Sequence, residues 1–294
     1  MKKVITAILV GSLALSTLFA EGQTDRAGGP VDRTAGQTDR TAGQADRKAS
    51  PAPYTIEVGG STSVTPLMEL LAAGYQKAKP HIKVNINGTG SGDGIKNAGV
   101  LYQIGMSSRE LTPAEQGMGL ITQVIAIDGI AAIVNSANPV SSLSIEQIRD
   151  IYTGAVTDWS QVSGGAKKGK IAVISREEGS GTRGAFEELV RFQGKLLRGA
   201  TESTSTGAIK AGIAGNADAI GYISLGSVDS SVKAISVGGV AATNANVVNG
   251  SYKIARPFIV LSKKDAHAES KAFVEWILSP EGQAIVKKSW IPVK

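Results

Sequence analysis

The chain has no cysteine among its 294 residues, which excludes a disulfide framework, a thiol nucleophile and a cysteine-ligated zinc site. Its two histidines, His81 and His267, do not have the spacing of metal ligands. Aromatic residues make up only 5%, whereas 36 residues are glycine. This composition favours turns and close backbone approaches over bulky ligand cages.

The excess of positive over negative charge is also small. The formal net charge is +6, and removal of the segment that holds Lys2 and Lys3 leaves about +4. The excess is scattered along the chain. Nucleic-acid binding needs basic residues clustered on one face, so we expect no nucleic-acid partner, and the mild excess fits attraction of small anions.

The N-terminal segment has the pattern of a signal peptide. Two lysines precede an apolar run at 4–20, and polar residues follow at 21–23. The alternative, a membrane anchor, fits less well because the run is short and is broken by Gly11, Ser12 and Ser16. We therefore expect a cleavable signal peptide over residues 1–20 and a periplasmic or secreted protein. No cysteine follows the run, so a lipid anchor at that point is excluded.

A repeat occupies the next segment. The pair Asp-Arg recurs every seven residues, at 25–26, 32–33, 39–40 and 46–47. A coiled coil would need large apolar residues at its seam, and this segment has too little apolar surface to offset the entropy of ordering. The pattern predicts a disordered linker over residues 21–53. Attachment to a cell wall or to a partner is the alternative.

From Tyr54 onward the sequence is typical of an α/β protein. Predicted strands alternate with predicted helices, which indicates mainly parallel sheets. The expected strands are 54–58, 82–86, 103–106, 124–134 (a long apolar stretch interrupted by Asp128-Gly129), 170–174, 219–223 and 254–261. The expected helices are 66–77, 113–117, 144–152, 182–192, 208–214, 266–278 and 280–287. Ser144 and Gln147 have the spacing of a capping box at one helix start.

Three loops rich in glycine, serine and threonine follow predicted strands, at 59–63, 88–94 and 176–183. Helix N-termini present unpaired N–H groups and the positive end of the helix dipole. Glycine permits close backbone approach, hydroxyl groups donate, and an arginine adds a charge-assisted pair. Three such helix starts that converge would enclose a tetrahedral anion.

Each loop alone is more typical of a strand-to-helix turn with a serine or threonine cap, and it is the three together, one of them with an arginine, that favour a site. The glycines at 88, 90, 92 and 94 do not match the dinucleotide fingerprint, and the GxxxxGK match at 164–170 lacks the following Ser or Thr. Neither a nucleophile elbow nor a carboxylate cluster occurs in the sequence. We therefore expect a binding protein, not an enzyme, with no cofactor and no metal.

These loops resemble those of the phosphate-binding proteins of ABC-type phosphate transporters. The resemblance runs from Tyr54 to about Trp290. The segments that carry it are GGSTSVTPLM (59–68), GTGSGDGI (88–95), IGMSSREL (104–111), AIDGIAAIVN (126–135), IYTGAVTDW (151–159), REEGSGTRGAF (176–186) and AIGYIS (219–224).

The resemblance implies a type II periplasmic-binding-protein fold, in which two α/β lobes are joined by two crossing strands. The crossings would fall near 128–134 and 253–259, so that lobe one is 54–131 plus 256–294 and lobe two is 132–255. It implies a monomer that captures inorganic phosphate outside the cytoplasm and delivers it to the membrane permease of an ABC transporter. Binding of sulfate or molybdate, or a role as an adhesin or phosphate sensor, remain alternatives.

The resemblance also implies a set of phosphate-binding residues. They are Thr62, Ser63, Ser91, Ser108, Arg176, Ser180, Gly181 and Thr182. One position departs from the family pattern, because well-known members carry at position 108 an aspartate that accepts the proton of hydrogen phosphate. Of the acids nearby, Asp93, Glu110 and Asp128, we expect Asp128 to take that role, since an acid inside an apolar strand is costly unless it is paired or functional.

Overall fold

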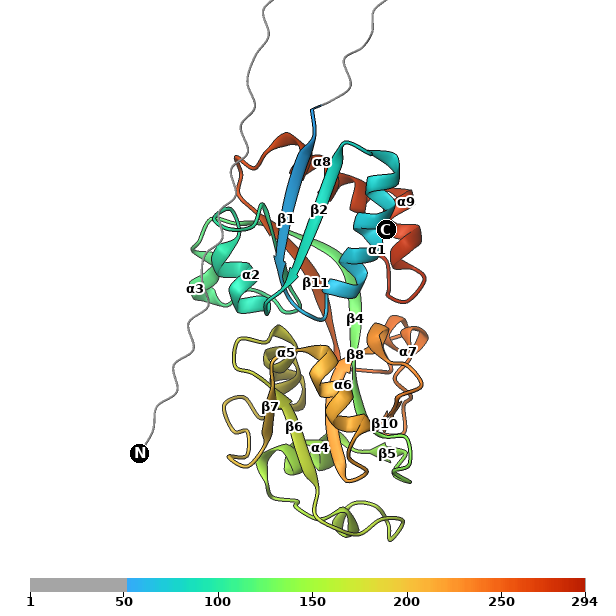
Figure 1. Ribbon diagram of the computed structural model, residues 1–294. Helices are drawn as coiled ribbons and strands as arrows, with labels where there is room; N and C mark the ends of the chain where they lie inside the picture. The colour runs from blue at the N-terminus through green and yellow to red at the C-terminus, as the bar shows by residue number, and fades with distance from the viewer. Residues whose placement is uncertain (1–51, 294) are drawn as a thin grey trace, which may run out of the picture. The chain divides into compact units, whose positions relative to one another are not determined.

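The computed structural model describes residues 52–293 (Figure 1). The expected signal peptide and residues 21–51 of the expected linker lie outside the described residues. The described residues, 52–293, belong to one compact unit. Within residues 52–293, none of the helices is both long and apolar enough to cross a membrane.

One half of this unit is built around β1, and we call it the β1 half. Strands β1 (Tyr54–Gly60), β2 (Ile82–Gly88) and β3 (Ile104–Ser107) are parallel. Strand β11 (Ala255–Ser262) is antiparallel to β3 and to the first part of β4 (Ile121–Asn135). The helices of this half are α1 (Thr65–Ala78), α2 (Ser91–Asn97), α3 (Pro113–Gln116), α8 (Ala268–Ile277) and α9 (Pro280–Val286).

The other half, the β8 half, is built on the second part of β4, which is antiparallel to β8 (Ala219–Ser224) and β9 (Val232–Ala234). Strand β6 (Ala172–Arg176) lies parallel between β8 and β7 (Thr201–Ser203). The remaining elements are β5 (Ser142–Leu143), β10 (Ser236–Val237), α4 (Ile145–Thr153), α5 (Gly181–Val190), α6 (Thr206–Ala214), α7 (Asn244–Val248) and the short 3₁₀ helices η1 (Trp159–Gln161) and η2 (Leu225–Ser227).

Strand β4 connects the halves. It is continuous through Asp128 and Gly129, the two residues that interrupt its apolar sequence. Ile130, Ala132 and Val134 pack in one core cluster, and Ala131 and Ile133 in another. Successive side chains of a strand point to opposite faces, so both faces of this part of β4 are buried, which explains its continuous apolar sequence.

The predicted element types agree well with the structure. Ser144 caps α4, and Gln147 completes the capping box, as predicted. The expectation of mainly parallel sheets is correct for β1, β2, β3, β6 and β7 but wrong for β4 and β11, whose pairings with their neighbours are antiparallel. Strand β4 runs from the β1 half to the β8 half, and β11 returns beside it. The two strands are therefore antiparallel to each other.

Three segments of the β1 half lie close together: the ends of β1 and β3 and the helix α2. A Cβ atom on Gly94, in α2, would lie 2.7 Å from Gly60 Cα and 2.7 Å from the carbonyl oxygen of Met106. Gly60 itself has φ of 134°, which side chains rarely permit. The start of α2 can therefore approach the ends of β1 and β3 only because glycine occupies both positions.

We expect Gly94→Ala to destabilise the protein. Alanine raises helix propensity by about 1 kcal/mol, but its Cβ would collide with backbone atoms, and such overpacking costs about 1–3 kcal/mol or more. The measurement is the free energy of unfolding in urea. The control is Gly199→Ala, whose Cβ would be 3.5 Å from its nearest neighbour. Equal stability of the two variants would contradict the close approach.

Candidate anion-binding site

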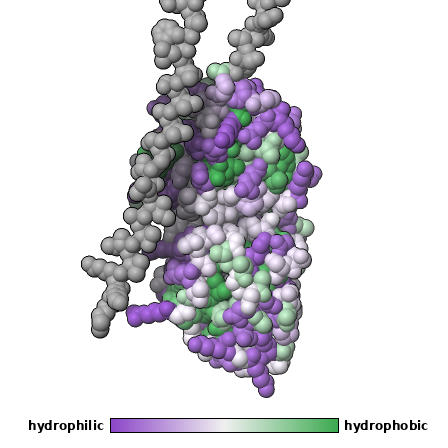
Figure 2. All heavy atoms as spheres, in the orientation of Figure 1, coloured by the Kyte–Doolittle hydropathy of each residue, from purple (hydrophilic) through white to green (hydrophobic). Residues whose placement is uncertain are grey.

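Seven hydroxyl side chains gather where the two halves meet, and we call them the hydroxyl cluster. They come from the starts of four helices and from the end of β3. The members are Ser61, Thr62, Ser63, Ser91, Ser108, Thr182 and Thr206. All are buried except Thr62, which is half-buried. Figure 2 shows one outer face of the unit, where residues of intermediate hydropathy appear between the more polar ends.

Within the β1 half, Ser108 is the centre of this cluster. Ser61 Oγ donates to Ser108 Oγ at 2.9 Å. Ser91 Oγ lies 3.3 Å from Ser108 Oγ and accepts from the Ser108 N–H at 3.2 Å. The segments at 61, 91 and 108 are thus held together by hydroxyl groups that can reverse the direction of donation.

Contacts across the two halves complete the cluster. Ser63 Oγ lies 2.7 Å from Thr182 Oγ1 and 2.9 Å from Thr206 Oγ1. The Thr206 N–H donates to Thr62 Oγ1 at 3.3 Å. Nearby, the Gly92 N–H donates to the carbonyl of Gly179 at 3.0 Å. The structure therefore has the two halves closed on each other at this point.

The helix starts around the cluster differ in how they are capped. Neither α1 nor α2 has a side chain bonded to its first-turn N–H groups. Ser180 caps α5 by accepting from the Arg183 N–H, and Ser205 caps α6 in the same way. A helix N-terminus carries a partial positive charge, so the starts of α1 and α2, which lack a side-chain cap, attract an anion.

Arg176 brings a guanidinium that lies against a hydroxyl group of the cluster. Its side chain is only 2% exposed. Nε and Nη2 donate to the two carboxylate oxygens of Glu177, at 2.8 and 2.7 Å. Nη1 is directed to Thr206 Oγ1 at 3.4 Å. One edge of the guanidinium is therefore neutralised by Glu177, and the opposite nitrogen faces the hydroxyl groups.

The backbone at Arg176 is fixed by a buried tyrosine. The Arg176 N–H donates to the hydroxyl of Tyr222 at 3.1 Å, and Ser175 Oγ lies 2.8 Å from the same hydroxyl. Burial raises the pKa of Tyr222 to about 12, so the ring stays neutral. Phe186 stacks on it with ring centroids 4.1 Å apart. The strand end that carries Arg176 is thereby held rigidly in the core.

Gly181 makes a close approach from the β8 half to the hydroxyl groups of the β1 half. A Cβ atom at this position would lie 2.4 Å from Ser91 Oγ and 2.9 Å from Ser108 Oγ. No other residue type fits there without moving these hydroxyl groups. The start of α5 can meet the β1 half because position 181 has no side chain.

Asp128 does not join the cluster. Its carboxylate accepts from Ser224 Oγ at 2.8 Å and from Arg256 Nη2 at 3.2 Å. Arg256 in turn donates from Nη1 to the carbonyl of Ser108 at 3.2 Å. Among the described residues, an arginine side chain thus stands between Asp128 and the hydroxyl groups that the sequence analysis expected it to accompany.

The structure brings together most of the residues singled out from the sequence. Those in the cluster or touching it are Thr62, Ser63, Ser91, Ser108, Arg176, Gly181 and Thr182. Ser180 is buried beside them, but its hydroxyl serves as a helix cap. Sequence reasoning missed Ser61 and Thr206. Ser61 lies within the first loop. Thr206 follows Ser205, whose side chain caps α6. The sequence prediction starts this helix at 208 and so does not use Ser205 as a cap.

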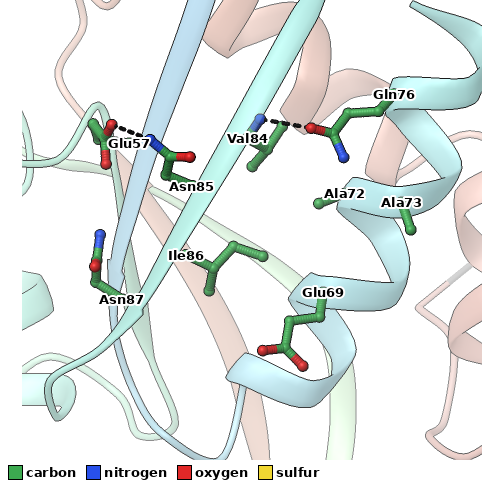
Figure 3. A pocket seen from close by; sticks show the side chains of 9 residues that line it. All are labelled: Glu57, Glu69, Ala72, Ala73, Gln76, Val84, Asn85, Ile86 and Asn87. Carbon is green, nitrogen blue, oxygen red and sulfur yellow. Dashed lines mark hydrogen bonds between the residues drawn. The ribbon is translucent and has the colours of Figure 1, made fainter. Parts of the chain in front are cut away.

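A groove lies elsewhere, between α1 and the edge strand β2 (Figure 3). It has a volume of about 550 Å³ and includes Glu57 and Glu69. Gln76 Oε1 accepts from the Val84 N–H there at 2.9 Å and so covers part of the free strand edge. The groove shares no residue with the hydroxyl cluster. Over residues 52–293, no group of three or more His, Asp or Glu side chains is placed to hold a metal ion.

Comparison of the sequence with known proteins finds a matching superfamily and a similar named protein. A profile of the PBP superfamily domain matches residues 34–281. The phosphate-binding protein PstS 2 of Streptococcus agalactiae is 42% identical over 151 residues, which are 48% of this chain and 52% of that protein. The match thus spans about half the length of this relative.

Solved structures match over more of the chain. A Clostridium perfringens protein described as a phosphate ABC transporter substrate-binding protein, with bound phosphate, is 47% identical. It has a TM-score of 0.79, and the match covers 82% of this chain and 100% of that one. An ABC-type phosphate transport receptor from Vibrio cholerae is 36% identical with a TM-score of 0.67, covering 81% and 99%.

We expect Gly181→Ala to weaken the binding of tetrahedral oxyanions by about 10-fold or more, since an added methyl group in a tight contact costs about 1–3 kcal/mol. The collision occurs only where the halves meet, so the melting temperature should change little. The measurement is a calorimetric titration with inorganic phosphate. Gly179→Ala is the control, because its Cβ would have no heavy atom within 4 Å. Equal affinities would contradict this role of Gly181.

Proposed function

The chain belongs to the PBP superfamily, and from this premise we propose that it captures inorganic phosphate outside the cytoplasm and delivers it to the membrane permease of an ABC-type importer. The role is binding and release without catalysis. The relatives named above are phosphate-binding and phosphate-transport proteins. The chain acts as a monomer on its way to the permease.

The observation that carries this proposal is the enclosed hydroxyl cluster with a single, half-neutralised arginine. A tetrahedral oxyanion has four oxygens that accept from many directions, which suits donors arriving from α1, α2, α5 and α6. Desolvation of the anion is compensated by these donors and by the Arg176 charge.

The proposed contact set follows from the geometry. Thr62, Ser63, Ser91 and Ser108 donate from the β1 half, and Arg176, Gly181, Thr182 and Thr206 from the β8 half. Ser180 supports the loop as a cap. The lobes correspond to 54–131 plus 256–294 and to 132–255, with β4 and the chain entering β11 as the crossings. Since both lobes contribute donors, only the closed form engages all of them, and ligand binding favours closure.

The ligand is tested by titration of the wild-type protein with phosphate, sulfate and molybdate under identical buffer conditions. We expect phosphate to bind most tightly and to reduce the radius of gyration in solution scattering. Tighter binding of sulfate or molybdate would assign the protein to another oxyanion. Absence of binding to all three would overturn the proposed function.

We expect Arg176→Ala to lower phosphate affinity severely. Loss of one partner of a desolvated charge pair costs about 2–5 kcal/mol, and here it would also leave Glu177 unpaired near the anion. The measurement is the phosphate dissociation constant. The matched control is Arg149→Ala, which removes an exposed arginine paired with Asp150 in α4. An Arg176 variant with the affinity of the control would remove Arg176 from the site.

A further inference from the structure

A buried ion pair lies directly behind the hydroxyl cluster, at the place where the chain crosses between the halves. Asp128 on β4 and Arg256 on β11 are opposite each other in the antiparallel register. Their side chains are 1% and 2% exposed, and Arg256 Nη2 lies 3.2 Å from Asp128 Oδ2. The two residues are 128 positions apart in the chain, so the pair exists only in the folded protein.

This pair reaches into both halves. Arg256 Nη1 donates to the backbone carbonyl of Ser108, the centre of the cluster on the β1 side. On the other side, Asp128 Oδ1 accepts from Ser224 Oγ at the end of β8 and, at 3.5 Å, from the Gly226 N–H. A continuous chain of polar contacts therefore runs from Ser108 through Arg256 and Asp128 to the β8 half.

Stability alone does not account for the pair. Burial disfavours both charges: it raises the pKa of Asp128 and lowers the pKa of Arg256, and their mutual attraction offsets only part of this effect. Well-packed apolar side chains usually stabilise such a position as well as a buried ion pair does. In addition, Arg256 Nε is buried without a partner among the described residues. These costs are consistent with a function outside stability.

The guanidinium of Arg256 has a shape that can hold other groups in position. Its planar fork holds two acceptors in a fixed relation, here the Ser108 carbonyl and the Asp128 carboxylate. The Phe258 ring lies 5.4 Å from the guanidinium carbon and restrains it from the same strand, β11. A lysine would keep the positive charge but lacks the planar fork that sets both acceptors in one geometry.

We propose that Arg256 is a positioning residue of the anion site, which fixes the Ser108 segment and, through Asp128, ties it to the end of β8 in the closed form. The inference rests on the proposed phosphate-binding function. It assigns Asp128 a role different from that expected from the sequence: Asp128 orients Arg256 and does not accept a hydrogen bond from the anion.

The test compares Arg256→Lys with the wild-type protein in phosphate titrations. We expect about 10-fold weaker binding, although the charge is retained, because the fork geometry is lost. Arg109→Lys is the matched control: it is the neighbour of Ser108, but its guanidinium binds Glu115 at 2.6 and 2.8 Å instead of the Ser108 carbonyl. Wild-type affinity in Arg256→Lys would overturn the proposal.

A double-mutant cycle separates positioning from general disturbance of the fold. If Arg256 acts through Ser108, the Arg256→Lys change has little further effect, within about 2-fold, in a Ser108→Ala background. The same change combined with Thr206→Val, in the other half of the cluster, keeps its full effect. Additive losses with Ser108→Ala would overturn the proposal, because Arg256 would then act by another route.

Asp128→Asn supplies an independent variant in case Arg256→Lys does not fold. It keeps the shape of the side chain but removes the charge that orients Arg256. We expect weaker binding of phosphate and sulfate by the same factor, so that the ratio of their affinities is unchanged. A fall in that ratio would make Asp128 a direct acceptor from the anion, and unchanged affinity would remove the pair from the site. Failure of the wild-type protein to bind phosphate would be seen separately, as failure of the proposed function.

Discussion

The burial of one guanidinium among neutral hydroxyl groups is the constraint on which the rest of this site depends. Arg176 loses its hydration, and Glu177 compensates only one edge of it. The remaining nitrogen needs acceptors, and a buried charge without them is costly. Thr206 supplies one from the start of α6, and the hydroxyl groups of the β1 half connect to it through Ser63. Glycine at 60, 94 and 181 lets β1, α2 and the start of α5 come close enough for these hydroxyl groups to contact one another.

Much of this arrangement could be predicted from the sequence, because it is encoded locally. A strand followed by a loop of glycine and serine and then a helix specifies its own geometry, so the loops at 59–63, 88–94 and 176–183 were identified with most of their residues. The failures were of two kinds. Thr206 was missed because the loop before α6 contains no glycine and its one cue, the cap Ser205, was passed over. The antiparallel pairing of β4 and β11 differs from the expected parallel sheets, because local propensity does not reveal pairing with a distant strand.

Asp128 shows most clearly where local reasoning ends. An acid inside an apolar strand is costly unless it is paired or functional, and the sequence favours function at the anion; nothing near Asp128 in the sequence identifies the arginine that pairs with it. The partner lies on β11, and only the antiparallel register places Arg256 opposite it. In the same way, the carbonyl of Ser108 has no side-chain signature at all. Contacts that depend on sheet register across more than a hundred residues need the structure, whereas helix starts and glycine-rich turns do not.

The division of the hydrogen-bond donors between the two halves also affects how an anion would be released. A site that held an oxyanion mainly with arginines and lysines would keep most of its attraction after opening, because charge acts over several ångströms. Hydroxyl groups and helix N-terminal N–H groups act over hydrogen-bond distance only. In the proposed contact set the short-range donors are divided between Thr62, Ser63, Ser91 and Ser108 on one side and Gly181, Thr182 and Thr206 on the other. Opening by a few ångströms would therefore remove about half of the short-range donors at once, leaving Arg176 partly cancelled by Glu177. A small hinge motion can then change affinity greatly without any change in charge, which is what a protein that must both capture and hand over an anion requires.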